Sequence, residues 1–218
     1  MNNSLNKLIE ECGERIEFYI NIGQKNNYWI DLEMDKYNSI ENEDMMYPFT
    51  IDFSSEYINE ICTITGYIVN NNIPFWTLDA VSGDFTEIAA YALEEDGGLN
   101  AKYGFKSKDE FLFEADSFII IDRFKISENL RNKGLGSLLL KPAIKAIISE
   151  IYEPYAEVPY GIVLLASAYE YIGKDNLYKE QTEKLIKFYE RLGFKRIKET
   201  KVMYLTEKGL NSKNKKKK

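Results

Sequence analysis

The chain has 218 residues, of which 44% are hydrophobic, and its 16 tyrosines and 12 phenylalanines make it rich in aromatic side chains. This composition is unlike that of a disordered protein and is sufficient for one large core. No apolar run approaches the roughly 18 residues of a membrane span, and the N-terminus lacks the form of a signal peptide. Two cysteines give neither a disulfide framework nor zinc-ligand spacing. We therefore expect a cytoplasmic protein with no membrane segment and no metal site.

The net charge is −7, although five of the last six residues are lysines. An acidic body argues against general nucleic-acid binding and favours an amine-bearing partner. We expect residues 211–218 to be a disordered, lysine-rich tail. The chain contains no histidine, so a general base would be a carboxylate, a water, or a deprotonated Tyr, Lys or Cys.

The N-terminal part is expected to form a short helix followed by a hairpin. Ser4 is placed to cap a helix that ends near Gly13. Apolar and polar residues then alternate over 16–22 and again over 28–34, which predicts two antiparallel strands.

The middle of the chain is less regular. The polar stretch 35–49 is expected to be a loop, and the apolar run 61–69 a strand. Capping residues and apolar spacing predict helices over 82–97 and 107–115.

From residue 117 onward, strands and helices alternate, which indicates an α/β fold. The expected elements are a strand at 117–126, a helix at 135–152, a strand at 161–168, a helix from 182, and strands at 194–199 and 201–206. Pro142 should loosen or kink its helix. No linker or repeat interrupts the sequence, so residues 1–210 are expected to form one domain.

The turn between the strand 117–126 and the helix 135–152 carries the clearest chemical signal. It reads Arg131-Asn132-Lys133-Gly134-Leu135-Gly136. The first amides of a helix lack intrahelical acceptors and lie at the positive end of its dipole. Gly134 and Gly136 remove Cβ atoms and allow a positive φ where the loop curls, and Arg131 and Lys133 add charge. The turn is therefore predicted to bind a phosphate or pyrophosphate.

Several interpretations of this turn compete. A Walker loop would need Lys-Ser or Lys-Thr after the glycines, and a dinucleotide fingerprint would need glycine at Leu139. An ordinary tight turn between a strand and a helix is a further alternative. The remaining pattern, R-x-x-G-x-G after an apolar strand, resembles the acyl-CoA-binding motif of the GNAT superfamily of N-acyltransferases, in which loop amides hold the CoA pyrophosphate.

A second stretch, residues 182–194, resembles the other GNAT signature, a helix that ends in Y-x-x-x-G-F. Here the pattern consists of Tyr189, Gly193 and Phe194. By itself, the apolar spacing in this stretch would indicate only the buried side of an amphipathic helix. Both motifs occur in the family's order with a strand between them, and the resemblance covers about residues 58–207.

The resemblance implies a GNAT fold. This is a mixed, strongly twisted sheet flanked by helices, which splays open after its fourth core strand and binds CoA in that cleft. Residues 71–115 and 169–181 lengthen two connections relative to the compact family pattern. We interpret both as walls of an acceptor site, although insertions without function are nearly as well supported.

The resemblance also implies the chemistry: an acetyl or other acyl group moves from acyl-CoA to an amine by direct attack on the thioester. Tyr189 would be the general acid that protonates the departing thiolate. The backbone N–H of Phe124 would polarise the thioester carbonyl, and Ile126 would lie nearer the pantetheine arm.

Asp122 is the candidate base. Residues 120, 122, 124 and 126 share one face of their strand, and Ile120 cannot accept a proton. A structural ion pair of Asp122 with Arg123 or a lysine, and a water chain in place of a side-chain base, remain open.

The co-substrate is expected to be acetyl-CoA. The residues assigned to CoA by the resemblance are Phe124, Ile126, Arg131, Asn132, Lys133, Gly134, Leu135, Gly136, Ser137 and Thr182. Thr182 stands where relatives often have an asparagine, so a hydroxyl would have to replace that polar contact. The hydroxyl of Ser137 would add to the phosphate contacts.

Three functional classes are open. The first is an N-acetyltransferase that acts on a small-molecule or protein amine. The second is a CoA-binding sensor or regulatory module without turnover. The third is a toxin-like acetyltransferase that acts on aminoacyl-tRNA, for which the lysine tail is the sole support. We do not expect a nucleic-acid partner, and a homodimer stays open.

Overall fold

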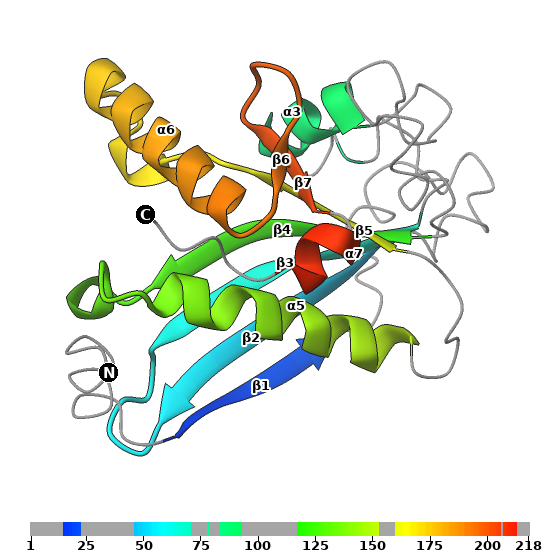
Figure 1. Ribbon diagram of the computed structural model, residues 1–218, viewed down its shortest axis with the longest axis vertical. Coiled ribbons are helices and arrows are strands. Elements are labelled where there is room, and N and C mark those ends of the chain that lie inside the picture. Colours follow the sequence, from blue (N-terminus) through cyan, green and yellow to red (C-terminus); the bar gives the residue numbers. More distant parts are fainter. Residues whose placement is uncertain are drawn as a thin grey trace, which may run out of the picture. The chain divides into compact units, whose positions relative to one another are not determined.

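The computed structural model describes residues 15–22, 46–70, 78, 83–92, 117–152, 160–205 and 207–212. Seven strands are hydrogen-bonded in the order β1-β2-β3-β4-β5-β7-β6, and helices flank the mixed sheet (Figure 1). The predicted α/β class is therefore confirmed, whereas the splay after the fourth core strand stays a prediction. The chain divides into two compact units, Met1–Tyr67 with Ile121–Ala156, and Ile68–Ile120 with Glu157–Lys218, which are described in turn.

In the first unit, β1 (Ile16–Ile22) pairs antiparallel with β2 (Met46–Ser55). The strand predicted at 16–22 is confirmed, but the loop predicted over 35–49 is wrong from Met46 onward. The buried residues of β2 are Met46, Phe49, Ile51 and Phe53. The buried residues Met46 and Phe49 are three positions apart instead of two, and Pro48 lies between them, so the alternation that marks a strand is concealed. The helix predicted near Ser4, the strand at 28–34 and the helix at 107–115 lie outside the described residues.

The remaining elements of this region follow the sequence closely. Strand β3 spans Cys62–Asn70, β4 spans Ser117–Ile126 and helix α5 spans Leu135–Tyr152. Helix α5 continues through Pro142, which is exposed, and buries one apolar side. The residues on that side are Leu135, Leu139, Leu140, Ala143, Ile144 and Ile147.

The second unit contains the C-terminal strands. Strand β5 (Tyr160–Leu165) pairs antiparallel with β7 (Val202–Leu205), which pairs antiparallel with the short β6 (Lys195–Arg196). Helix α3 (Gly83–Ala92) packs against β5 and β7, and α6 (Asp175–Arg191) packs against β6. A short helix, α7 (Glu207–Asn211), follows β7.

Helix α6 begins earlier than its sequence predicts. The stretch 169–181 holds a 3-10 turn over Tyr169–Tyr171 and the first two turns of α6, from Asp175. These turns are almost entirely exposed, so they carry no apolar stripe that would reveal a helix. Gly173, with φ 86°, turns the chain immediately before the helix.

Tight packing marks the other end of α6. Helix α6 ends at Arg191 with Leu192 as its C-cap, and Gly193, with φ 98°, follows as the helix-terminating glycine, as predicted. A Cβ at Gly193 would lie 2.7 Å from the carbonyl oxygen of Gly209, so the ends of α6 and α7 approach backbone to backbone. Within the described ranges, no helix has the length and apolar character needed to cross a membrane.

Candidate functional site

The turn between β4 and α5 is tied to the start of β3. The N–H of Ser127 donates to the carbonyl of Ile61 at 3.1 Å, and its hydroxyl donates to the carbonyl of Glu60 at 2.6 Å. One 3-10 turn, Glu128–Leu130, follows, and Leu130 is buried. The position at which the chain leaves the sheet is therefore fixed by hydrogen bonds.

The guanidinium of Arg131 closes the turn on itself. Its Nε donates to the carbonyl of Ile126 at 3.0 Å, so part of this side chain maintains the shape of the loop. Asn132 and Gly134 have φ values of 62° and 89°, both in the left-handed region. Asparagine tolerates this conformation and glycine adopts it without strain. The curl predicted for this loop is therefore confirmed, with Asn132 and Gly134 as its two left-handed residues.

The first turn of α5 follows directly from this curl. The carbonyl of Gly134 accepts hydrogen bonds from the N–H groups of Ser137 at 3.1 Å and Leu138 at 3.3 Å, which begins the helix. Helix geometry leaves the N–H groups of Leu135 and Gly136 without intrahelical acceptors, at the positive end of the dipole.

One detail of the sequence prediction is wrong. Gly136 does not have a positive φ, because it already lies within the first turn of α5 and is buried there.

On β4, the side chains of Asp122, Phe124 and Ile126 are half-buried, whereas Arg123 and Lys125 are exposed. The first three share one face, as the strand period predicts. Nη1 of Arg123 lies 3.3 Å from Oδ1 of Asp122, so the ion pair considered from the sequence is present. Because the Arg123 side chain is 45% exposed, this pair contributes little stability.

Cysteine and tyrosine could each act as a base in place of histidine, but in this unit Cys62 and Tyr67 are both kept protonated. Burial, followed by the charge of Asp52, raises the pKa of the Cys62 thiol to about 12. Burial, followed by the charge of Asp122, raises the pKa of Tyr67. Raised pKa values make both groups weaker candidates for a base at neutral pH.

Tyr189 lies on the buried side of α6, in the second unit. Its ring is 8% exposed and makes edge-to-face contacts with Phe188 at 5.1 Å and Phe194 at 5.5 Å between ring centroids. The carbonyl of Tyr189 accepts the N–H groups of Leu192 and Phe194, at 2.9 and 3.1 Å. The ring is therefore fixed by packing and by the end of its helix.

Thr182 occupies the same buried side, two turns earlier. Its Oγ1 accepts a hydrogen bond from the N–H of Ala168 at 3.3 Å, which joins α6 to the chain that leaves β5. The hydroxyl proton remains available as a donor.

The predicted site residues thus fall into two sets. Asp122, Phe124, Ile126 and the turn 131–137 belong to the first unit, and Thr182 and Tyr189 belong to the second. Within each unit, the structure brings its own set together on neighbouring turns or along one strand.

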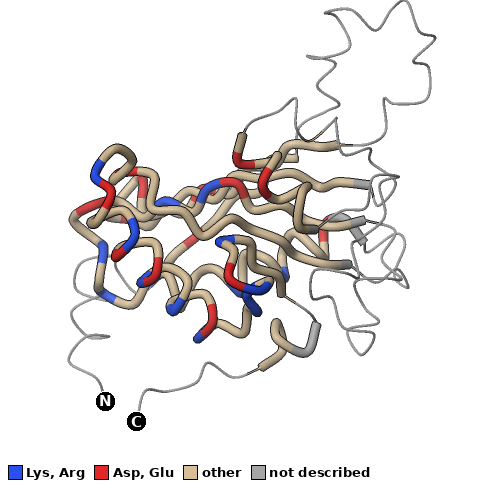
Figure 2. Tube along the Cα trace, turned by 90° about the horizontal axis from the view of Figure 1, so that it is seen from above, with Lys and Arg blue, Asp and Glu red and all other residues tan. Residues whose placement is uncertain are grey.

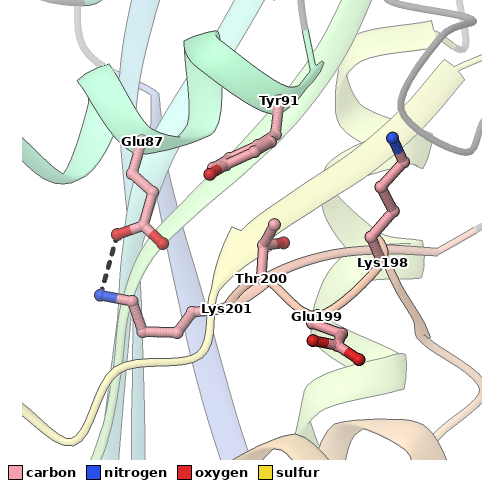
Figure 3. Close-up of a pocket in the computed structure, with 6 residues that line it drawn as sticks. All are labelled: Glu87, Tyr91, Lys198, Glu199, Thr200 and Lys201. Carbon is pink, nitrogen blue, oxygen red and sulfur yellow. Dashed lines mark ion pairs between the residues drawn. The ribbon is translucent and has the colours of Figure 1, made fainter.

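A hollow of about 590 Å³ lies in the second unit, between α3 and the turn that joins β6 to β7 (Figure 3). None of the predicted site residues lines it. The residues that do are Glu87, Tyr91, Lys198, Glu199, Thr200 and Lys201. We call this feature the α3-turn hollow.

One wall of the hollow is a chain of polar contacts. Nζ of Lys201 lies 2.8 Å from Oε2 of Glu87 and donates to the hydroxyl of Tyr178 at 3.3 Å, which is 2.9 Å from Oγ of Ser167. Glu87 belongs to the stretch 71–115, and Tyr178 to 169–181. The two stretches interpreted as acceptor walls therefore meet at Lys201. No local signal predicts this meeting, because its members are far apart in the sequence.

The protonation of Lys201 is stabilised by this wall. Burial, the largest influence, would lower the pKa of Lys201, but hydrogen bonds and charges of Glu87 and Tyr178 outweigh it and leave the pKa raised. The ammonium form is therefore the one that the folded protein favours.

Charge is mixed rather than gathered along the described elements (Figure 2). Helix α6, for example, alternates lysines with glutamates, and Lys184 forms an i,i+4 pair with Glu180 at 2.7 Å. Such interspersed charge is typical of a solvated helix face.

No protein-family model and no curated relative matches this sequence. A solved structure described as the KacTA–DNA complex matches 89% of this chain and 96% of its own, with 12% identity and a TM-score of 0.41. AtaT complexed with acetyl-methionyl-tRNAfMet matches 89% and 97%, with 11% identity and a TM-score of 0.42. AtaTR bound with AcCoA matches 89% and 96%, with 10% identity and a TM-score of 0.40.

These structures contain acetyltransferases of the GNAT type, the family that the two sequence motifs resemble. At these identities and TM-scores, the likeness transfers no activity and no partner to this chain. The function is therefore argued from the chain's own residues.

We expect the stabilising contribution of Lys201 to disappear in strongly alkaline solution. Because its pKa in the folded protein lies above the ordinary value of 10.5, the contribution is complete below that value and is lost as the pH rises through the folded-state pKa. Thermal unfolding of wild type and Lys201→Met, measured from neutral to alkaline pH, should show a difference that shrinks only above about pH 10.5. The exposed Lys184→Met is the control, with little effect at any pH. A difference that stays constant over the whole range would contradict the prediction.

Proposed function

We propose that this protein is a GNAT-type N-acyltransferase, which moves an acetyl or other acyl group from acyl-CoA to an amine by direct attack on the thioester. One observation carries the proposal: the R-x-x-G-x-G turn curls through Asn132 and Gly134 and presents the first amides of α5. An anion cradle directly after a strand suits the pyrophosphate of CoA. The expected compartment, the cytoplasm, is part of the same proposal.

The residues of the first unit would bind the co-substrate. The amides of Leu135 and Gly136 would face the phosphates, with Lys133 and Ser137 adding an ammonium and a hydroxyl. Arg131 would act mainly by shaping the loop, because its Nε is already bonded to Ile126. Phe124 and Ile126 would lie along the pantetheine arm.

Acyl-CoA supplies the activated acyl group as a thioester. The N–H of Phe124 would polarise the thioester carbonyl, and Asp122 would accept a proton from the amine, directly or through a water. Tyr189 would donate its phenolic proton to the departing thiolate, and Thr182 would offer its hydroxyl proton to CoA. Each role requires only a group that this chain possesses, and none requires a histidine or a metal ion.

Two alternatives differ from this proposal in measurable ways. A CoA-binding sensor would bind CoA without releasing free thiol in the presence of acetyl-CoA and any amine. Transfer to aminoacyl-tRNA would require tRNA binding that weakens steeply with salt. Because solved structures of similar proteins are described as complexes with DNA and with tRNA, nucleic acid is included in the acceptor screen.

Replacement of Gly134 tests the phosphate cradle. Gly134→Val should weaken CoA binding by at least about 100-fold, because charge-assisted hydrogen bonds contribute about 1.5–3 kcal/mol each and a branched side chain would displace the loop amides. Gly173→Val is the matched control: Gly173 has φ 86° against 89° for Gly134, and a Cβ at either position meets nothing within 4 Å. Calorimetry on folded variants measures the effect. Equal CoA affinity in both would refute the cradle.

Substitutions at Asp122 and Arg123 distinguish a catalytic carboxylate from a structural ion pair. Asp122→Asn should lower turnover by roughly 10²–10⁴-fold and flatten the acid limb of the pH–rate profile, as for a positioned proton acceptor. Arg123→Met removes the same ion pair but keeps the carboxylate, so its turnover should stay near that of wild type. Equal losses of rate in the two variants would show that the ion pair, and not the base, is what matters.

Tyr189→Phe tests the proposed acid. The ring contacts with Phe188 and Phe194 persist in this variant, so thermal stability and CoA affinity should barely change. Both kcat and kcat/KM should fall together, by about 10–10³-fold, because the lost interaction forms mainly in the transition state. Steady-state kinetics with an acceptor found by screening measures this. An unchanged kcat would show that Tyr189 contributes only to packing and is not the acid.

A further inference from the structure

The α3-turn hollow has the volume of a small-molecule site, and four of its six lining residues are charged. Its volume of about 590 Å³ falls within the roughly 300–1,000 Å³ typical of such sites. Helix α3 contributes Glu87 and Tyr91, and the turn between β6 and β7 contributes the other four lining residues (Figure 3). All six belong to the second unit.

The turn that forms one side of the hollow is held by hydrogen bonds and an ion pair. Thr200 donates from its N–H and from its hydroxyl to the carbonyl of Ile197, at 3.1 and 2.6 Å. Arg196 donates to the carbonyls of Thr200 at 2.6 Å and Glu199 at 3.2 Å, and lies 3.1 Å from the carboxylate of Glu183 on α6. These contacts hold the turn to the helix.

The contacts of this turn impose an unusual backbone conformation on Lys198. Its φ of 47° is in the left-handed region, which is costly for a residue with a side chain. Strain of this kind persists only where surrounding contacts determine it, and it concentrates at binding sites. Lys198 therefore lines one side of the hollow, while the carboxylate of Glu199 is turned away from Tyr91 (Figure 3).

The opposite side carries a fixed carboxylate. One oxygen of Glu87, Oε2, is bound to Lys201, which is in turn held by Tyr178. The other oxygen points toward the side where Tyr91 and Thr200 lie, and the hydroxyl of Tyr91 points toward Glu87 (Figure 3). Glu87 and Tyr91 therefore place hydrogen-bond acceptors beside the ammonium of Lys201, across the hollow from Lys198 (Figure 3).

We propose that the α3-turn hollow binds a small zwitterion, an amine joined to a carboxylate by a short carbon chain. The ligand's ammonium would lie against Glu87 and Tyr91, and its carboxylate against Lys198. A ligand with only one of these charges would leave one wall unmatched. The proposal extends beyond acyl transfer, because binding here requires neither CoA nor turnover.

Binding is measured by calorimetry, without CoA, on the full chain. The probes are glycine, β-alanine, 4-aminobutyrate and 6-aminohexanoate, whose charges stand at increasing separations. The one-charge analogues of 4-aminobutyrate are butylamine and butyrate, and corresponding pairs are used for the other lengths. One zwitterion length should bind best, and each of its one-charge analogues should bind at least about tenfold more weakly.

Variants assign the binding to this hollow. Lys198→Met should weaken the best zwitterion at least about tenfold, and it leaves the Glu87–Lys201 pair intact; thermal unfolding of the variant confirms that it is folded. Glu87→Gln should weaken it similarly. Lys184→Met and Glu180→Gln remove charges from an exposed pair on α6 and should change nothing. The proposal is overturned if no zwitterion binds, if a one-charge analogue binds equally well, or if Lys198→Met binds with unchanged affinity.

Discussion

The candidate CoA site depends on how the chain turns between β4 and α5. Ser127 fastens the end of β4 to Glu60 and Ile61, and Arg131 closes the loop onto Ile126. With both ends held, the left-handed residues Asn132 and Gly134 turn the chain directly into the start of α5. If this curl were absent, the same amides would be an ordinary helix start, and neither the CoA proposal nor its residue roles would follow.

The second unit is organised around a different interaction, the ion pair between Lys201 and Glu87. It joins helix α3 to the beginning of β7, and Tyr178 extends it to α6. Partly buried charges need partners, so this pair adds a polar contact to the apolar packing of Phe85, Ile88 and Ala89 on α3. The same pair forms part of one wall of the α3-turn hollow. The other side of the hollow is connected to α6 by the ion pair between Arg196 and Glu183.

Asp122 shows how a structural and a catalytic reading can rest on one residue. Its carboxylate pairs with Arg123, which the sequence already offered as an alternative to catalysis. An ion pair with an exposed arginine contributes little to stability. The pair alone therefore does not explain why a half-buried carboxylate stands at this position. Burial raises the pKa values of Cys62 and Tyr67, which makes these two groups weaker candidates for the base.

The sequence by itself determined the elements whose signals are local: the strand Ser117–Ile126, the helix Leu135–Tyr152, the left-handed Gly134 and the helix-ending Gly193. Periodicity and glycine conformation depend on neighbours along the chain, so they can be read without a fold. Tertiary structure alone decided that Met46–Ser55 is a strand, because its pairing with β1 overrides a broken pattern. It also decided the contact of Lys201 with Glu87 and Tyr178, since interactions between distant residues leave no periodic signal in the sequence.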